Sequence, residues 1–290
     1  MGFKVSMMPK VRIVTDSTAD LPPALLARYN IDVVPAVVVV NGQEHLDGAG
    51  LSREAFYRQL PTMSPLPTTA APSVGMFEAA YAQALEKAEA VVAVHCASSL
   101  SSIYQHACLA AEKFAGRVHV VDSGQLTLGI GFQALAAAEA AARGGDVAEA
   151  LAAVEAIRTR VRLIAMLDTL EFLRRSGRVS WAKARLGSLL RIKPFLEVRH
   201  GEVLSLPAVR TRRKGLAHLA EHLRALGPLD YLAVLHTGAE DDARALLAAA
   251  DTSALRLQPL VVFVTTVIGT HVGPNGVGFV AVPRETAQGA

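Results

Sequence analysis

The sequence predicts an α/β protein with two domains, the first built on a mostly parallel sheet and the second on a mixed sheet. A chain of 290 residues with 51% hydrophobic content is long enough for two cores. Short apolar strands alternate with helical segments over the first half, which is typical of a parallel sheet. Near Arg160 the pattern changes, and two strands beyond it pair as a hairpin. We therefore expect domains at residues 1–157 and 158–290.

The first predicted strand, at residues 11–14, is followed directly by a polar segment, residues 15–20, that carries hydroxyl and carboxyl side chains. Asp20 is predicted to be the N-cap of the following helix, because two prolines suited to a first helical turn come just after it. Open α/β sheets place their ligands at the carboxyl ends of strands. Ser17 and Thr18 are therefore candidate ligand-binding residues, although helix capping explains either of them equally well.

Residues 31–40 are almost continuously apolar and predict one strand covered on both faces, ending in an Asn-Gly tight turn. Residues 61–73 contain four prolines, which excludes a helix or a central strand there. A thirteen-residue irregular segment of this kind suggests a binding loop, with Thr68 and Thr69 as its hydrogen-bonding groups. A plain surface connection is the alternative.

Two further strands, at residues 90–94 and 118–121, also run into hydroxyl and carboxyl groups. Hydroxyls and free backbone N–H groups at a helix start together hold a carboxylate or phosphate. Because parallel strands end at one edge of a sheet, we expect these groups to lie beside Ser17 and Thr18. The additional candidate ligand-binding residues are Ser98, Ser101, Asp122 and Ser123.

Residues 129–134, Gly-Ile-Gly-Phe-Gln-Ala, superficially match a dinucleotide-binding fingerprint. Their glycines begin seven residues beyond Asp122 and lie inside a helical pattern, not in the first turn after a strand. We expect no nucleotide site there. That helix ends at a Gly-Gly pair, and Asp146 with Glu149 predicts a capping box for the next helix.

The second half is predicted to contain strands and helices in mixed order. The predicted strands are residues 161–167, 195–198, 203–206, 231–235 and 260–265, and the predicted helices are residues 169–176, 213–226 and 240–250. In residues 267–278, five Gly or Pro residues surround His271 and predict a tight loop that brings backbone close to a ligand. His271 is therefore a candidate ligand-binding residue, whereas the other histidines are expected to be structural.

Charge is unevenly distributed along the chain. Residues 158–214 contain fifteen Lys or Arg and four Asp or Glu, a net charge of +11, which leaves −8 for the remainder of a chain of net charge +3. This basic first part of the second domain indicates an anionic partner surface, with a solvated helical face as the alternative. The aromatic content of 5% and the lack of helix-turn-helix or zinc spacing argue against a nucleic acid as that partner.

No apolar run reaches the roughly 18 residues of a membrane-spanning helix, and the first ten residues lack the apolar core of a signal peptide. We expect a cytoplasmic protein without stable membrane insertion. Cys96 and Cys108 are the only cysteines and are expected to be free thiols instead of a disulfide or metal ligands. Nothing in the sequence indicates a metal site or a cofactor.

Five motifs, in this order, resemble the DegV family, the bacterial fatty-acid-binding proteins that act as acyl carriers for a separate fatty acid kinase. They are Val-Thr-Asp-Ser-Thr-Ala-Asp-Leu from Val14, Leu-Ser-x-x-Tyr-Gln from Leu100, Val-Asp-Ser from Val121, Leu-Glu-Phe-Leu-Arg-Arg-Ser-Gly-Arg-Val-Ser from Leu170 and Gly-Thr-His-Val-Gly-Pro from Gly269. The resemblance implies an N-terminal three-layer α/β/α domain with a parallel sheet and a C-terminal two-layer α/β domain with a mixed sheet. A long-chain fatty acid such as palmitate would be buried between or beneath them.

The resemblance also implies roles for individual residues. The fatty carboxylate is expected at Thr69, Ser101 and His271. The kinase is expected to dock at Arg174, Arg175 and Arg178. The implied protein is a carrier and not an enzyme, and its ligand is the fatty acid alone, without a cofactor. Three departures from the family's usual motifs, at Ala70-Ala71, Ser102-Ile103 and Asn275, affect the expected shape of the head-group site.

A serine hydrolase acting on an ester is the alternative that the sequence leaves open. Ser101 and His271, with Asp16 or Asp122, would supply its catalytic triad. The sequence lacks the Gly-x-Ser-x-Gly elbow of many such enzymes. The mutual geometry of these side chains discriminates between the two interpretations.

Overall fold

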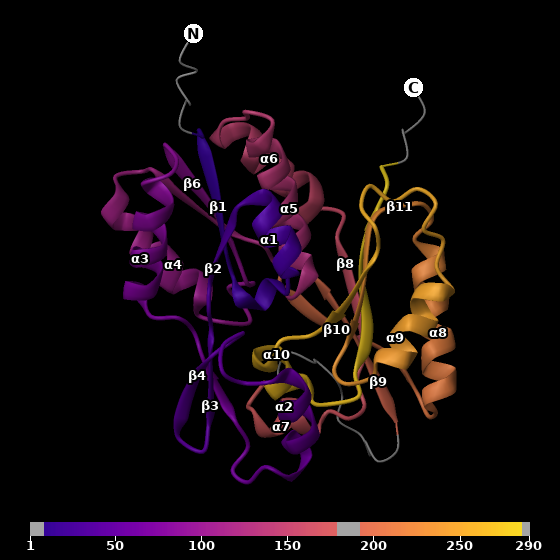
Figure 1. Ribbon diagram of the computed structural model, residues 1–290. Coiled ribbons are helices and arrows are strands. Elements are labelled where there is room, and N and C mark those ends of the chain that lie inside the picture. Colours follow the sequence, from indigo (N-terminus) through magenta and orange to yellow (C-terminus); the bar gives the residue numbers. More distant parts are fainter. Residues whose placement is uncertain (1–8, 179–191, 286–290) are drawn as a thin grey trace.

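The computed structural model describes residues 9–178 and 192–285 (Figure 1). Its first half contains a four-stranded sheet, sheet A, with all strands parallel and in the order β2-β1-β6-β7. The strands are β1 (Val11–Asp16), β2 (Ile31–Val34), β6 (Ala90–His95) and β7 (Val118–Asp122). They are rich in valine and largely buried, as expected of strands covered on both faces. The predicted parallel sheet is confirmed.

Helices cover both faces of sheet A (Figure 1). One layer consists of α3 (Val74–Leu85) and α4 (Ile103–Ala111), and the other of α1 (Pro23–Tyr29), α5 (Leu128–Ala142) and α6 (Val147–Arg158). The predicted capping box at the start of α6 is present, because the Asp146 carboxylate accepts from the Glu149 N–H at 3.0 Å and the Glu149 carboxylate accepts from the Asp146 N–H at 2.9 Å. This half is the expected three-layer α/β/α arrangement.

Asp20 does not cap α1, contrary to the sequence prediction. Pro22 occupies the N-cap position of α1, and Asp20 instead ends the short 3₁₀ helix η1 (Ser17–Ala19) in the left-handed conformation, with φ of 53°. Its carboxylate accepts a hydrogen bond from the backbone N–H of Thr265, 2.9 Å away. A contact between the two halves of the chain has therefore replaced the local cap.

Residues 31–40 form two strands in two sheets, not the single strand predicted. After β2 the chain passes through Pro35, which has no N–H for a ladder hydrogen bond, and continues as β3 (Val37–Val40). β3 is the middle strand of a small antiparallel sheet, sheet B, between β4 (Gln43–Leu46) and β5 (Thr68–Ala70). The Asn-Gly turn between β3 and β4 is confirmed, since Asn41 and Gly42 both have positive φ.

The proline-rich segment is partly ordered as an edge strand. β5 lies within residues 61–73 and pairs with β3 so that Thr69 lies opposite Val38. An edge strand agrees with the prediction that this segment contains no central strand. Two short helices precede β5: α2 (Arg53–Gln59) and the 3₁₀ helix η2 (Leu60–Thr62). The prediction that residues 61–73 contain no helix was therefore wrong at Pro61 and Thr62, because a proline is accommodated in the first turn of a helix.

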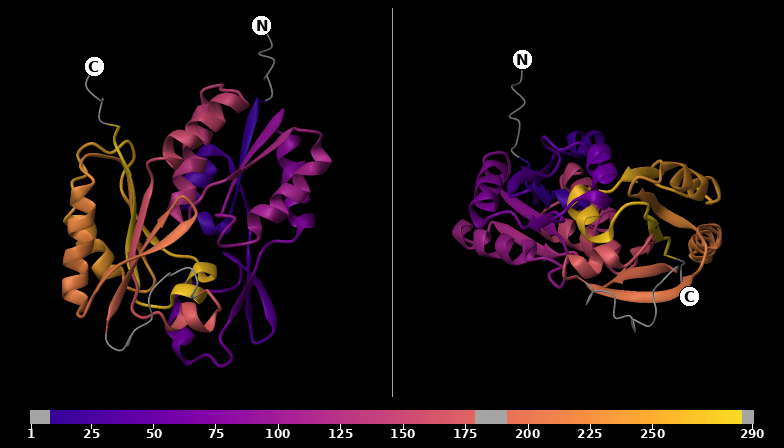
Figure 2. Two further views of the ribbon diagram at one scale, coloured as in Figure 1. Left: turned by 180° about the vertical axis from the view of Figure 1, so that it is seen from behind. Right: turned by 90° about the horizontal axis from the view of Figure 1, so that it is seen from below.

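The second half contains a six-stranded sheet, sheet C, with the order β10-β9-β8-β13-β11-β12. Only β11 and β12 are parallel, so the predicted mixed sheet is confirmed. The strands are β8 (Arg162–Met166), β9 (Lys193–Arg199), β10 (Glu202–Val209), β11 (Leu229–His236), β12 (Leu260–Phe263) and β13 (Val277–Pro283). Two helices, α8 (Arg212–Ala225) and α9 (Glu240–Ala248), cover its outer face, which gives the expected two layers (Figure 2). The change between sheets falls between α6 and β8; the domain boundary at residue 157 itself stays a prediction.

The C-terminal loop prediction was wrong in two respects. Residues 266–272 form a helix, α10 (Thr266–Val272), that ends at Gly273 with φ of 76°. β13 follows and lies in the middle of sheet C, between β8 and β11, although no strand was predicted there. The glycines indicate a loop, but the apolar run Val-Gly-Phe-Val-Ala-Val that contains one of them forms β13, which pairs with β11 on one side and β8 on the other. The remaining short helices are α7 (Glu171–Arg175) and η3 (Glu112–Phe114).

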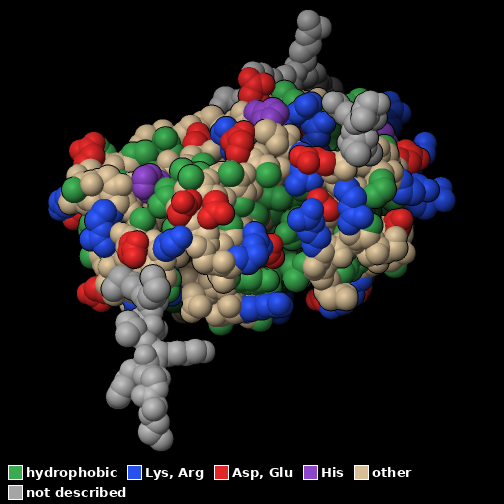
Figure 3. All heavy atoms as spheres, turned by 90° about the horizontal axis from the view of Figure 1, so that it is seen from above, with side chains coloured by type: hydrophobic (Ala, Val, Ile, Leu, Met, Phe, Trp, Pro, Cys, Tyr) green, Lys and Arg blue, Asp and Glu red, His purple; other side chains and the backbone are tan. Residues whose placement is uncertain are grey.

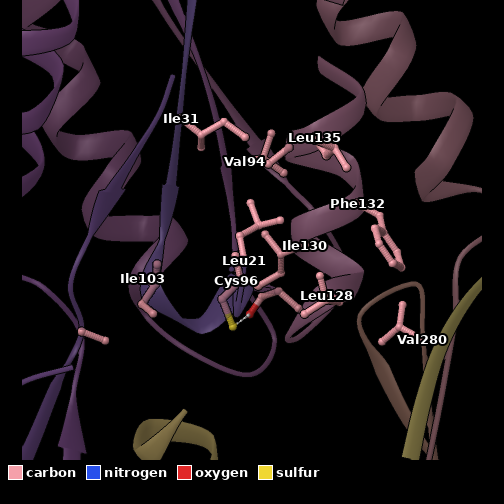
Figure 4. Close-up of a cluster of buried hydrophobic side chains, with 14 of the residues drawn as sticks. Leu21, Ile31, Val94, Cys96, Ile103, Leu128, Ile130, Phe132, Leu135 and Val280 are labelled. Carbon is pink, nitrogen blue, oxygen red and sulfur yellow. Dashed lines mark hydrogen bonds between the residues drawn. The ribbon is translucent and has the colours of Figure 1, made fainter. Parts of the chain in front are cut away.

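Helix α5 joins the two halves, because it is buried nearly all round. In Figure 4, Leu135 lies beside Val94 of sheet A and Ile130 lies beside Leu21, whereas Phe132 points toward Val280 of sheet C. The Phe132 ring also packs against Tyr231, with ring centroids 5.2 Å apart. The inner face of sheet C thus packs on α5 at one end of the molecule, and at the other end it faces α10, the yellow helix between the halves in Figure 2.

Candidate functional site

A cavity lies between the inner face of sheet C and the carboxyl end of sheet A. Its volume is about 1030 Å³, a figure that includes the solvent-filled space at its open mouth. Its walls are mainly aliphatic and come from five strands of sheet C, from α10 and from the segments that follow β6 and β7. The principal aliphatic wall residues are Leu100, Ile103, Leu126, Leu163, Leu167, Leu196, Val198, Val203, Leu235, Val264, Val267, Ile268, Val272 and Val277.

Thr69, Ser101 and His271 line this cavity from three different elements. Thr69 is on β5, Ser101 lies just before α4, and His271 is in the last turn of α10. The Thr69 hydroxyl and the His271 Nε2 are hydrogen-bonded at 2.9 Å, and which of them donates depends on the imidazole tautomer. The Ser101 hydroxyl accepts from the backbone N–H of Ile103 at 3.3 Å and keeps its own proton for another acceptor. The chain therefore brings residues from positions 69, 101 and 271 to one cavity.

His271 is uncharged at neutral pH. Burial lowers its pKa from 6.5 to about 4, and the nearby positive charge of Arg178 lowers it further in the same direction. A neutral imidazole offers one donor and one acceptor nitrogen. The neutral His271 ring can therefore hydrogen-bond either a carboxylate or a protonated carboxylic acid without forming a buried ion pair.

Arg178 also lines the cavity, and it is the one Lys or Arg that does so among the described residues. Its guanidinium donates to the backbone carbonyl of Ser176 at 2.9 Å. Arg174 and Arg175, by contrast, are exposed on α7, and Arg174 pairs with Glu171 at 2.8 Å. The three arginines grouped by sequence are thus divided between the cavity and the surface.

The other predicted ligand-binding residues occupy different places. Thr18 lines the cavity, but its hydroxyl donates to the Asp16 carboxylate. The Ser17 hydroxyl accepts from the Ala36 N–H at 3.1 Å and so holds the chain between β2 and β3. Ser98, Asp122 and Ser123 border a separate surface pocket beside the turn between β9 and β10. Those three side chains are not brought to the cavity, and their role in ligand binding remains a prediction.

The carboxylates considered for a hydrolase triad are engaged elsewhere. Asp16 accepts from the His95 Nδ1 and from the Cys96 N–H, each at 3.1 Å. Asp122 accepts from the backbone N–H groups of Ser98 and Gly124. His271 is hydrogen-bonded to Thr69 through its Nε2, so this geometry does not assemble the order nucleophile, base and acid that a triad requires.

Sequence reasoning missed several polar residues that line the cavity, among them Thr127, His236 and Thr237. His236 and Thr237 follow the carboxyl end of β11, so the rule that drew attention to Ser17 and Ser98 also applies to them. Thr127 gave no such signal. It has φ of 46°, which is uncommon for a residue other than glycine, and only the tertiary structure shows it.

Lys and Arg side chains do not form one continuous patch on the face seen from above. Lys and Arg side chains gather toward the right-hand half, over the part of the molecule that carries sheet C, and are interspersed with Asp and Glu (Figure 3). Residues 179–191, which belong to the basic segment 158–214, lie outside the described residues. The role of that segment in binding an anionic partner remains a prediction.

Comparison with known proteins decides the family. A family model described as "Uncharacterised protein, DegV family" matches residues 10–284, nearly the whole chain. The chain belongs to the DegV family. A DegV domain-containing protein of Deinococcus radiodurans is 39% identical over 278 residues, which cover 94% of this chain and 98% of that protein.

Solved DegV structures share the fold. A DegV family protein from Thermus thermophilus, described by its fatty acid binding, has a TM-score of 0.87 and 33% identity, and the match covers 95% of this chain and 100% of that one. DegV from Bacillus subtilis, described as a fatty acid binding protein, has a TM-score of 0.83 and 28% identity, with 96% and 100% covered. The DegV fold predicted from the motifs is confirmed.

No helix in residues 9–178 and 192–285 combines the length and apolar character needed to cross a membrane. Within the same residues, no group of three or more His, Cys, Asp or Glu side chains is arranged to hold a metal ion.

Proposed function

We propose that this protein binds a long-chain fatty acid in the cavity and presents its carboxylate to a separate kinase, which converts it to an acyl phosphate. The observation that carries the proposal is the combination of aliphatic walls with Thr69, Ser101 and His271 in one cavity. Relatives of the same fold are described as fatty acid binding proteins, which supports the same ligand class here.

The aliphatic walls supply most of the expected affinity. Burying a methylene group is worth about 0.8 kcal/mol, so a chain of about fourteen methylenes contributes on the order of 10 kcal/mol before ordering costs. The walls come from both halves of the chain, which allows the tail to be enclosed between sheet C and α10. The head group then needs only enough hydrogen bonds to replace those it made with water.

Hydroxyls and a neutral imidazole meet that need without a buried salt bridge. Ser101 and Thr69 are proposed to donate to the fatty carboxylate, and His271 is proposed to hold the Thr69 hydroxyl in place by donating its Nε2–H to the Thr69 oxygen. The Arg178 charge favours an anion at the same place. A carboxylate held by such groups keeps one oxygen available as the nucleophile toward the γ-phosphorus of ATP, with ADP as the leaving group. The carrier itself supplies no catalytic residue for that step, so the protein is proposed to be a carrier and not an enzyme.

Arg174, Arg175 and Arg178 are proposed to dock the kinase. The first two are exposed on α7, and α7 lies close to α10, which bears His271. Docking there would bring the kinase next to the cavity residues that hold the carboxylate. Both proteins are proposed to act in the cytoplasm, and the ligand is the fatty acid alone, without a metal or cofactor.

Reconstitution with a fatty acid kinase tests the presentation step. The purified protein, loaded with palmitate, is incubated with kinase and ATP, and acyl phosphate is trapped with hydroxylamine as the hydroxamate. Hydroxamate that depends on both proteins supports the proposal. Hydroxamate formed equally well from free palmitate and kinase would contradict it.

A further inference from the structure

The N-terminal end of α10 is held by side chains from the first sixty residues of the chain. The Asp20 carboxylate accepts from the backbone N–H of Thr265, the N-cap of α10, at 2.9 Å. The Asp47 carboxylate accepts from the Thr266 hydroxyl at 3.2 Å. Arg53 lies 3.4 Å from the same Asp20 oxygen and also donates to the backbone carbonyl of Phe263. The four contacts fix the start of α10 relative to the first half.

Helix α2 contacts α10 along its side. The Tyr57 hydroxyl lies 3.1 Å from the backbone carbonyls of both Val264 and Thr265. Gly269 of α10 allows this approach, because a Cβ atom there would lie 2.1 Å from the Tyr57 oxygen. α10 therefore has little freedom to shift while these contacts hold.

The buried positions of the Asp20 and Asp47 carboxylates are energetically unfavourable. Asp20 is 5% exposed and Asp47 is 8% exposed, and within the described residues the second oxygen of each has no hydrogen-bond partner. Burying two carboxylates beside one guanidinium is unfavourable unless each is fully hydrogen-bonded. Such incomplete satisfaction is typical of sites where function and not stability selects the residues.

Asp20 changes its charge near neutral pH. Burial raises its pKa from 3.8 to about 7; the Arg53 charge opposes this rise, and Asp47 adds to it. The hydrogen bond from the Thr265 N–H also favours the charged form. The other titratable group that faces it, Tyr57, has a pKa well above its ordinary value of 10 because of burial and remains neutral.

Movement of α10 reaches the cavity directly. The helix has seven residues, about 10 Å of length, and His271 lies in its last turn with its Nε2 on the Thr69 hydroxyl. A displacement at Thr265 therefore changes the distance between His271 and Thr69. Ionised Asp20 holds Arg53 and the Thr265 N–H more strongly than the protonated acid does.

We propose that Asp20 and Arg53 are positioning residues for the head-group site, and that the charge on Asp20 sets the affinity of the cavity for a fatty acid. The inference rests on the proposed function, since it concerns the same cavity. The affinity of the cavity for a fatty acid is highest when Asp20 is ionised, and it falls as Asp20 gains a proton. His271 does not produce this change, because its pKa is about 4, well below this pH range.

The test measures the affinity for a fluorescent fatty acid, cis-parinaric acid, between pH 6 and pH 8.5. For the wild type we expect affinity to rise about tenfold across this range, since one proton is released per site. Asp20→Asn should bind weakly with no pH dependence. Arg53→Gln should bind weakly, and Arg53→Lys should recover part of the affinity. Asp32→Asn is the matched control, because Asp32 pairs with Arg12 at 2.6 Å outside the cavity.

A second measurement separates positioning from loss of folding. The ¹⁵N resonances of the His271 imidazole should show a pH-dependent shift with a midpoint near 7 in the wild type, well above the pKa of His271 itself, and none in Asp20→Asn. An Asp20→Asn protein with the wild-type affinity profile and the wild-type His271 shift would overturn the inference while leaving the proposed function intact. A wild type that binds no fatty acid at any pH would overturn both.

Discussion

His271 on α10 and Thr69 on β5 are hydrogen-bonded at 2.9 Å, although 202 residues separate them in the chain. β5 belongs to the small sheet B, and α10 follows the last strand but one of sheet C. The bond therefore forms only when sheet B, α10 and sheet C are all in place. It couples the head-group site to the packing of both halves of the molecule.

Replacing Thr69 by valine should weaken fatty acid binding by about tenfold, because a hydrogen bond to a charged ligand is worth roughly 1.5–3 kcal/mol and its loss is partly compensated by water. Valine keeps the shape and the β-branched character of the strand residue. Affinity is measured by fluorescence titration. Thr62→Val, at an exposed position of η2, is the matched control and should bind like the wild type. Equal affinity in both variants would remove Thr69 from the site.

Asp20→Asn should raise the melting temperature more at pH 8 than at pH 5. The pKa of Asp20 is about 7 in the folded protein and 3.8 ordinarily, so the folded state binds the proton more tightly. Its contribution to stability therefore becomes less favourable as pH rises from about 4 to about 7. Asparagine carries no charge at either pH, so the variant does not lose stability when the pH rises above the pKa of Asp20. Thermal unfolding at both pH values checks it, and a melting-temperature difference that does not change with pH would contradict the buried-carboxylate explanation.

Ala165→Phe should reduce the capacity of the cavity for long acyl chains. Ala165 is on β8 and lines the cavity, so a phenyl ring there fills space that the tail would occupy. Mass spectrometry of bound lipids should show C16 and C18 acids reduced several-fold relative to shorter ones. Ala165→Ser, which adds little volume, should keep the wild-type distribution. An unchanged chain-length distribution in the phenylalanine variant would mean that the tail lies elsewhere.

Arg178→Ala and Arg174→Ala should have different effects. Arg178 lines the cavity beside His271, so its removal should lower both the fatty acid content and acyl phosphate formation. Arg174 is exposed, so its removal should leave the fatty acid content unchanged and raise the concentration of carrier that half-saturates the kinase, more so at high salt. Full fatty acid content and full phosphorylation in Arg178→Ala would exclude both roles for that residue.

Features encoded by near neighbours were predictable from sequence. The capping box of Asp146 and Glu149 depends on residues three apart, and the Asn-Gly turn after β3 needs only two adjacent positive φ angles. Alternating strands and helices likewise gave the parallel sheet. Asp20 had a local interpretation as a helix cap, but its carboxylate binds the backbone 245 residues away, and no local pattern contains that information.

For the candidate site, too, some features were predictable from sequence and others were not. The rule that polar groups gather at strand ends identified real strand ends, yet Ser98 and Asp122 border a different pocket from Ser101. The number of residues between a strand end and a side chain does not show which way that side chain points after a turn. Thr69, Ser101 and His271 were named together because of the family resemblance, and no local pattern pointed to their meeting. Arg178 was grouped with its neighbours in sequence, whereas its position after α7 turns it into the cavity.

The most direct test of the account is mass spectrometry of an organic extract of the purified protein, comparing the wild type with Ser101→Ala, His271→Ala and the control Ser98→Ala. We predict close to one long-chain fatty acid per wild-type chain, a clear reduction in the Ser101 and His271 variants, and no change in the Ser98 variant. A wild type without lipid, which also takes up none when palmitate is supplied, would contradict the account.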